Sequence, residues 1–143
     1  MKGRQLTSGA RIMVVDDQPG IRALMRAVLR LDGHQVLPAA DWQEALQVAR
    51  EHRPQVIFLD LCMPVMSGWC LLPELRRLLP RAMFCLMSAD PLAAETYGPG
   101  GGPDWPLLKK PFDIHIVRAL AIELLSKHEA AVAEDVAPYW GKR

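Results

Sequence analysis

Acidic residues follow two of the most apolar segments of this sequence. Asp16 and Asp17 come directly after Ile12–Val15, and Asp60 comes directly after Val56–Leu59. Short apolar runs that end in this way are typical of buried strands, with each acid at the carboxyl end of its strand. In an open α/β sheet that edge is where ligands bind. Three carboxylates that meet there would repel one another, and a hard divalent cation such as Mg²⁺ would relieve the repulsion.

Two other polar residues stand near the ends of later apolar runs. Ser88 follows Met83–Met87, and Lys110 stands shortly after Leu107–Leu108. A hydroxyl and an ammonium group opposite the acids would suit a phosphoryl group, because its transfer depends mainly on positioning and on neutralisation of charge. The residue types therefore favour a phosphoryl group bound at Asp60.

Helical patterns separate these strands. Apolar residues recur at helical spacing after Gln18, Asp41, Ser67 and Asp113, and a shorter pattern covers Pro91–Tyr97. A weak strand is expected at His34–Leu37. Strands that alternate with helices predict an α/β fold, a flavodoxin-like doubly wound five-stranded parallel sheet in the order 2-1-3-4-5 with helices on both faces.

Local signals refine three of the helices. Asp41 and Glu44 form a capping pair at a helix start. Pro73 would cost about 3 kcal/mol inside a helix, so the helix after Ser67 is expected to start late or to bend. The stretch Gly98–Pro103 is rich in Gly and Pro, which excludes a helix there.

The 143 residues suit one domain. Residues 1–10 are expected to form a flexible N-terminal arm, residues 11–127 the folded domain and residues 128–143 a C-terminal tail. About 15 residues after the last predicted helix are too few for a DNA-binding output domain of ordinary size. The sequence is thus expected to act as a stand-alone module.

Composition argues against several classes of protein. The formal net charge is +1 without a block of like charge, so no direct nucleic-acid partner is expected. No run reaches the roughly 18 apolar residues that a membrane span needs, so no membrane insertion is expected. The three cysteines have no paired spacing, which favours buried, reduced thiols in a cytoplasmic protein.

Five short motifs together resemble the receiver domain of two-component response regulators, of the chemotaxis type. The resemblance covers roughly residues 11–127. Each motif is weak alone, but all five occur in order at predicted strand ends. They are Asp16-Asp17, the two parts Asp60–Pro64 and Ser67-Gly68 of the continuous run from Asp60 to Gly68, Ser88-Ala89 and Lys110-Pro111-Phe112.

The resemblance implies a role for each acid. Asp60 would be the phosphoacceptor. Asp17, Asp60 and the backbone carbonyl of Cys62 would hold Mg²⁺, and Asp16 would contribute through water.

The resemblance also implies roles for the two residues opposite the acids. Ser88 would be the switch hydroxyl that moves onto the phosphoryl group, and Lys110 would pair with that group. The Lys110–Pro111 peptide bond would be cis. Lys109 competes for the ion-pair role, but the family's lysine directly precedes the proline, and adjacent strand residues face opposite ways.

The implied function is that of a phosphorylation-controlled binding module. A phosphohistidine on a sensor histidine kinase or a histidine phosphotransfer protein, or a small acyl phosphate, would donate a phosphoryl group to Asp60 with Mg²⁺. This would change the binding of an unidentified downstream protein. The chain would not be an enzyme beyond assisting its own phosphorylation and dephosphorylation. It departs from the family at Leu107, where an aromatic residue is usual.

Two other functions compete with this one. A receiver-like scaffold that is not phosphorylated would act by protein–protein interaction alone. An enzyme of the same sheet type would be a phosphatase or a flavin carrier. The phosphatase requires an acid at position 62, which is Cys, and Asp16-Asp17 would repel the phosphate of a flavin.

Overall fold

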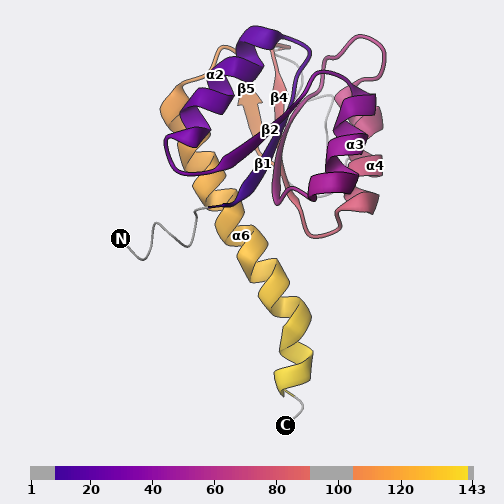
Figure 1. Ribbon diagram of the computed structural model, residues 1–143, viewed down its shortest axis with the longest axis vertical. Coiled ribbons are helices and arrows are strands. Elements are labelled where there is room, and N and C mark those ends of the chain that lie inside the picture. The colour runs from indigo at the N-terminus through magenta and orange to yellow at the C-terminus, as the bar shows by residue number, and fades with distance from the viewer. Residues whose placement is uncertain (1–8, 91–104, 142–143) are drawn as a thin grey trace.

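The computed structural model describes residues 9–90 and 105–141, and it forms a sheet covered by helices on both faces (Figure 1). The predicted helix at Pro91–Tyr97 and the stretch Gly98–Pro103 lie outside the described residues. The elements are β1 (Arg11–Val15), α2 (Pro19–Arg30), β2 (Gln35–Ala39), α3 (Trp42–His52), β3 (Val56–Asp60), α4 (Gly68–Leu78), β4 (Met83–Ser88), β5 (Leu107–Lys109) and α6 (Ile114–Gly141).

The sheet has five strands in the order β2-β1-β3-β4-β5, and every neighbouring pair is parallel. This confirms the predicted fold class and strand order. Because β1 and β3 are neighbours, the acids that follow these two strands reach the same edge of the sheet.

Two apolar cores lie on opposite faces of the sheet. Side chains of α3 and α4 pack against one face, and side chains of α2 and α6 pack against the other. All five residues of β3 are buried, as the continuous apolar run predicts for a central strand covered on both sides. Figure 1 shows α3 and α4 together on one side, with α2 and the first half of α6 on the other.

Local sequence signals account for the start of two helices. The Asp41 carboxylate accepts a hydrogen bond from the Glu44 backbone N–H at 2.8 Å, and the Glu44 carboxylate accepts one from Ala40 N–H at 2.6 Å. The predicted capping pair is therefore present. Helix α2 begins with Pro19, whose missing N–H would have no intrahelical partner in the first turn.

Helix α4 begins at Gly68 and contains Pro73, so a late start after the proline was wrong. A proline here removes one hydrogen bond of the helix. Leu71, Leu72 and Leu75 on the same helix are buried in the core. Burial of each leucine contributes roughly 1.5–3 kcal/mol, which together exceeds the cost of the proline.

The second strand runs over Gln35–Ala39 rather than His34–Leu37. It includes Pro38, which pairs with Val14 in the register. Strand β2 lies at the edge of the sheet, where a residue without a backbone N–H is tolerated on the outer side.

Helix α6 continues to Gly141, so the expected end of the helix near residue 127 was wrong. Residues 126–137 are mostly Ala, Glu, Lys and other residues that propagate a helix, and Glu123 and Lys127 form an i,i+4 ion pair at 3.3 Å. The helix of 28 residues is about 42 Å long. Its second half extends away from the body of the domain (Figure 1).

The cysteines differ from the expectation of buried thiols. Cys85 lies in β4 and is buried, whereas Cys62 and Cys70 are exposed. The two exposed cysteines lie outside the strands, which are the segments that helices cover on both faces. Burial raises the pKa of the Cys85 thiol to about 12. Within the described residues, no helix is both long enough and apolar enough to cross a bilayer.

Candidate functional site

Three carboxylates meet at the carboxyl edge of the sheet. Ligand oxygens of Asp16, Asp17 and Asp60 all lie within 4.8 Å of one another. Asp16 and Asp60 are buried, and Asp17 is exposed, so the cluster is open to solvent on one side. The register explains the meeting, because Val15 at the end of β1 pairs with Leu59, directly before Asp60.

Lys110 extends into this cluster from the end of β5. Its Nζ lies 2.7 Å from Asp16 Oδ2 and 3.4 Å from Asp60 Oδ2. Lys109 is exposed, which agrees with the expected alternation of two neighbouring residues. The Lys110–Pro111 peptide bond is cis, as the resemblance implied.

Burial and charge shift the pKa values of two members of the cluster. Burial raises the pKa of Asp60 and the negative charge of Asp16 raises it further, although the Cys62 N–H and Lys110 act in the opposite direction. Burial alone would lower the pKa of Lys110, but the hydrogen bond and charge of Asp16 and the charge of Asp60 outweigh it, so this pKa is raised. The ammonium form of Lys110 is therefore stabilised next to the acids.

The loop after Asp60 holds its carboxylate in place. The Cys62 backbone N–H donates to Asp60 Oδ1 at 3.0 Å. Gly68 packs directly under this loop: a Cβ atom at position 68 would lie 2.3 Å from the Asp60 carbonyl oxygen and 2.9 Å from Leu61 Cα. Only glycine allows the start of α4 to approach the backbone this closely.

Ser88 is buried at the end of β4, beside the loop that follows Asp60. Met87 pairs with Asp60 in the register, and Ser88 is the next residue. The Ser88 Oγ lies 3.6 Å from Cys62 Sγ and accepts a hydrogen bond from the Asp90 N–H at 2.9 Å. The hydroxyl therefore lies on the β4 side of the acidic cluster, while Lys110 approaches from β5.

Two residues at the start of α2 also belong to the site, and sequence reasoning missed them. Gln18 donates its N–H to Asp16 Oδ1 at 2.9 Å, and its Oε1 lies 3.4 Å from Lys110 Nζ. Arg22 donates from Nη1 to the Asp16 carbonyl oxygen at 2.7 Å. An aspartate two residues before Gln18 is a recognisable turn signal, because its side chain can accept that N–H. The contact of Arg22 depends instead on how α2 packs.

At position 107 this chain has a leucine where an aromatic residue is usual in receiver domains, and the packing around it differs accordingly. Leu107 pairs with Leu86 and is partly buried. The aromatic ring in this region comes from Trp105, whose centroid lies 5.3 Å from that of Phe84 at an interplanar angle of 57°. Trp105 is therefore part of the core on the α3 and α4 side.

The acidic cluster fits a divalent cation. The Asp16 Oδ2 is buried, and its one ion-pair partner among the described residues is Lys110 Nζ at 2.7 Å. Carboxylate oxygens and a backbone carbonyl are the ligands that Mg²⁺ prefers, and the exposed Asp17 leaves room for the waters that this ion retains.

Comparison with known sequences identifies one family for most of the chain. The family model of the response regulator receiver domain matches residues 12–121. Among curated proteins, the transcriptional regulatory protein KdpE of Mycobacterium tuberculosis is 32% identical over 126 residues, which cover 88% of this chain and 52% of KdpE. The transcriptional regulatory protein PrrA of the same species is 40% identical over 79 residues, 55% of this chain and 34% of PrrA. The chain thus spans about half or less of the length of these relatives.

Solved structures share the fold of this chain. A CheY-like receiver domain protein from Methanospirillum hungatei has a TM-score of 0.78 at 24% identity and covers 87% of this chain and 99% of its own. The chemotaxis protein CheY4 of Vibrio cholerae has a TM-score of 0.74 at 26% identity and covers 82% of this chain and 100% of its own.

Proposed function

This chain belongs to the family of response regulator receiver domains, and on that premise we propose that it is phosphorylated on Asp60 and signals through the change that follows. The observation that carries the proposal is the meeting of Asp16, Asp17, Asp60 and Lys110 at one edge of the sheet, although they lie far apart in the sequence. Such an arrangement of acids and one cation suits an acceptor of a phosphoryl group.

In the proposed reaction a carboxylate oxygen of Asp60 attacks the phosphorus of a phosphohistidine or of a small acyl phosphate. The new bond joins this oxygen to phosphorus, and the bond from phosphorus to the donor's nitrogen or oxygen breaks with its electrons leaving on the donor. The Cys62 N–H fixes Asp60 Oδ1 at 3.0 Å, which limits the orientations of the carboxylate. Fixing the nucleophile removes part of the entropic barrier to the reaction.

Lys110 and Ser88 would bind oxygens of the transferred phosphoryl group and so stabilise its negative charge. The ammonium group of Lys110 lies 3.4 Å from Asp60 Oδ2, so it is placed to pair with a phosphoryl oxygen on that side. The Ser88 hydroxyl, which is buried at the end of β4, would donate a hydrogen bond to another phosphoryl oxygen. A phosphoryl group adds roughly 1.5–2 negative charges. This charge would shift the equilibrium between two positions of Ser88 and of the segments that contain β4 and β5.

Asp16, Asp17, Asp60 and the Cys62 carbonyl would hold Mg²⁺. When bound, this ion neutralises negative charge on the carboxylates and on phosphoryl oxygens. Asp16 also positions Lys110 at 2.7 Å, so one carboxylate serves both the cation site and the lysine.

The proposed donor of the phosphoryl group is a sensor histidine kinase or a histidine phosphotransfer protein. The phosphorylated chain would then pass the signal to a downstream protein. The chain assists only its own phosphorylation and dephosphorylation. The printed names of KdpE and PrrA describe transcriptional regulators.

The decisive experiment is incubation with Mg²⁺ and acetyl phosphate, followed by mass spectrometry of the intact protein. Wild type should gain one phosphoryl group and Asp60→Asn should gain none, since the amide is not a nucleophile. Omission of Mg²⁺ should greatly slow labelling. Unlabelled wild-type protein, under conditions that label a control receiver, would favour the scaffold alternative. Full labelling of Asp60→Asn would show that another residue accepts the phosphoryl group.

A further inference from the structure

A polar cavity lies at the end of the sheet opposite to the acids. Its volume is about 220 Å³, and it is bounded by the starts of β1, β3 and β4, the ends of α3 and α4, and the middle of α6. The strands of five or six residues place it roughly 16 Å from the acidic cluster. This cavity is therefore separate from the proposed phosphorylation site.

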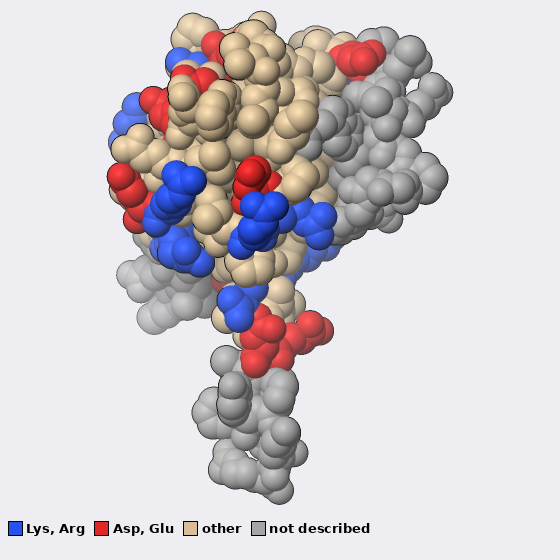
Figure 2. Space-filling model, turned by 90° about the vertical axis from the view of Figure 1, so that its right-hand side faces the viewer, with Lys and Arg blue, Asp and Glu red and all other residues tan. Residues whose placement is uncertain are grey.

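Basic and amide groups surround this cavity, above an apolar floor. Buried Pro54, Leu79 and Ala82 form the floor. The polar lining residues are Arg11, Arg53, Gln55, Arg81 and His128. Figure 2 shows Lys and Arg side chains gathered on the lower part of the α3 and α4 face, above the projecting part of α6. None of the described residues that line the cavity is acidic.

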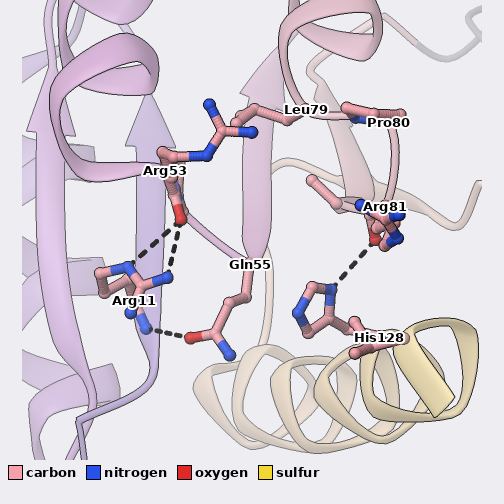
Figure 3. Close-up of a pocket in the computed structure, with 10 residues that line it drawn as sticks. Arg11, Arg53, Gln55, Leu79, Pro80, Arg81 and His128 are labelled. Carbon is pink, nitrogen blue, oxygen red and sulfur yellow. Dashed lines mark hydrogen bonds between the residues drawn. The ribbon is translucent and has the colours of Figure 1, made fainter. Parts of the chain in front are cut away.

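Arg11 and Gln55 are held in place by the backbone around them. Arg11 Nε donates to the His52 carbonyl at 2.8 Å, and its Nη2 donates to the Arg53 carbonyl at 3.0 Å. Gln55 Oε1 accepts from Arg11 N–H at 2.8 Å (Figure 3). Among the described residues, the Gln55 Nε2 group has no hydrogen-bond partner, so its two N–H donors remain available.

Arg53 lines the cavity at the end of α3, and its guanidinium extends toward Leu79 (Figure 3). It ends α3 with φ at +49°, where glycine or asparagine is the ordinary residue. Its guanidinium makes one long contact within the described residues, from Nη2 to the Leu78 carbonyl at 3.5 Å. The Arg53 guanidinium therefore lies exposed beside the cavity, with most of its N–H donors available to a ligand.

Arg81 and His128 close the α6 side of the cavity. Arg81 pairs through Nε with Asp135 of α6, and His128 Nδ1 lies 3.0 Å from the Arg81 carbonyl oxygen (Figure 3). One of the three guanidinium groups is therefore compensated by an acid. The remaining two leave the cavity with a positive charge that no described acidic side chain neutralises.

We propose that this cavity binds a small organic oxyanion, a carboxylate or phosphate group carried on a short apolar stem. Guanidinium and amide N–H groups bind such oxygens with two donors at once, and the floor of proline, leucine and alanine accommodates the stem. At about 220 Å³ the cavity is smaller than the about 300–1,000 Å³ of sites for drug-sized ligands, which favours a small ligand. This binding is independent of phosphorylation at Asp60.

The test is an NMR titration of the full chain with phenyl phosphate and, separately, benzoate. Sodium chloride at equal ionic strength and benzyl alcohol serve as probes without the oxyanion. We expect saturable shifts at the Gln55 side-chain amide and at the backbone of residues 53–55 and 81–82, also in the Asp60→Asn variant. The stronger of the two anions identifies the phosphate or the carboxylate as the preferred group.

Variants make the proposal falsifiable. Arg53→Gly should weaken binding at least tenfold without lowering the melting temperature, because glycine suits the positive φ at this position. Arg50→Gln removes an exposed arginine of α3 that does not line the cavity, and it should leave the affinity within twofold of wild type. Shifts that rise linearly without saturation, that chloride reproduces, or that persist unchanged in Arg53→Gly would overturn the proposal.

Discussion

Lys110 Nζ lies closer to Asp16 Oδ2, at 2.7 Å, than to Asp60 Oδ2, at 3.4 Å. The lysine is thus oriented mainly by an acid that we do not propose as the phosphoacceptor. Asp60 therefore keeps a carboxylate that is only loosely paired, which suits a nucleophile better than a tight ion pair would.

Substitution of this lysine tests its role in the reaction. We expect Lys110→Met to slow labelling of Asp60 by acetyl phosphate by about 100-fold, because loss of one group that stabilises the transition state has an effect of that order. Lys109→Met is the matched control, since Lys109 is exposed and lies outside the cluster. Equal rates in the two variants would remove Lys110 from the mechanism.

Asp60 is expected to reduce the stability of the domain when Mg²⁺ is absent. Burial and the charge of Asp16 raise the pKa of Asp60 in the folded state. Stability from this residue is present below the pKa of the unfolded chain and is lost as pH rises through the folded pKa. Asp60→Asn should therefore raise the melting temperature at pH 7 in the presence of a chelator.

The control for that measurement is Asp41→Asn, because asparagine caps a helix about as well as aspartate does. Its melting temperature should stay close to that of wild type. A lower melting temperature for Asp60→Asn than for Asp41→Asn would contradict the expectation that the buried charge is unfavourable.

Gly68 is expected to be essential for the loop that carries Asp60. Gly68→Ala would bring a Cβ within 2.3 Å of the Asp60 carbonyl oxygen, so α4 or the loop must move. We expect the free energy of unfolding to fall by about 3 kcal/mol, measured by urea denaturation. At Gly20 in α2 a Cβ would have no neighbour within 4 Å, so Gly20→Ala should not destabilise the protein.

The ion pair between Arg118 and Asp32 predicts a pH dependence of stability. Arg118 donates to both Asp32 oxygens, at 2.6 and 3.0 Å, and its hydrogen bond lowers the pKa of Asp32. This contribution is present above the unfolded pKa of about 3.9 and is lost as pH falls through the folded pKa. Arg118→Met should thus be less stable than wild type at pH 6.

Urea unfolding of both proteins between pH 6 and pH 2 checks this expectation. The difference between wild type and Arg118→Met should shrink towards the acid end of the series. A difference that stays constant over the whole range would show that Arg118 acts through packing of its side chain and not through the charge of Asp32.

The sequence by itself determined the class of fold and the edge of the sheet at which the acids lie. Buried strands require continuous apolar runs, and these runs are local features that end visibly at Asp16 and Asp60. The end of α6 was misjudged because the apolar stripe that marks a packed helix stops near Leu125, whereas the helix itself is continued by residues of high helix propensity.

Only the tertiary structure decided which side chains that are distant in the sequence contact one another. It placed Lys110 beside Asp16, Gly68 beneath Asp60, and Arg11, Arg53 and Arg81 around one cavity. Each of these contacts joins residues from different elements, and their distances depend on how strands and helices pack against one another. Local sequence patterns predict at which edge of the sheet such residues meet, but not these distances, because each pattern describes one element at a time.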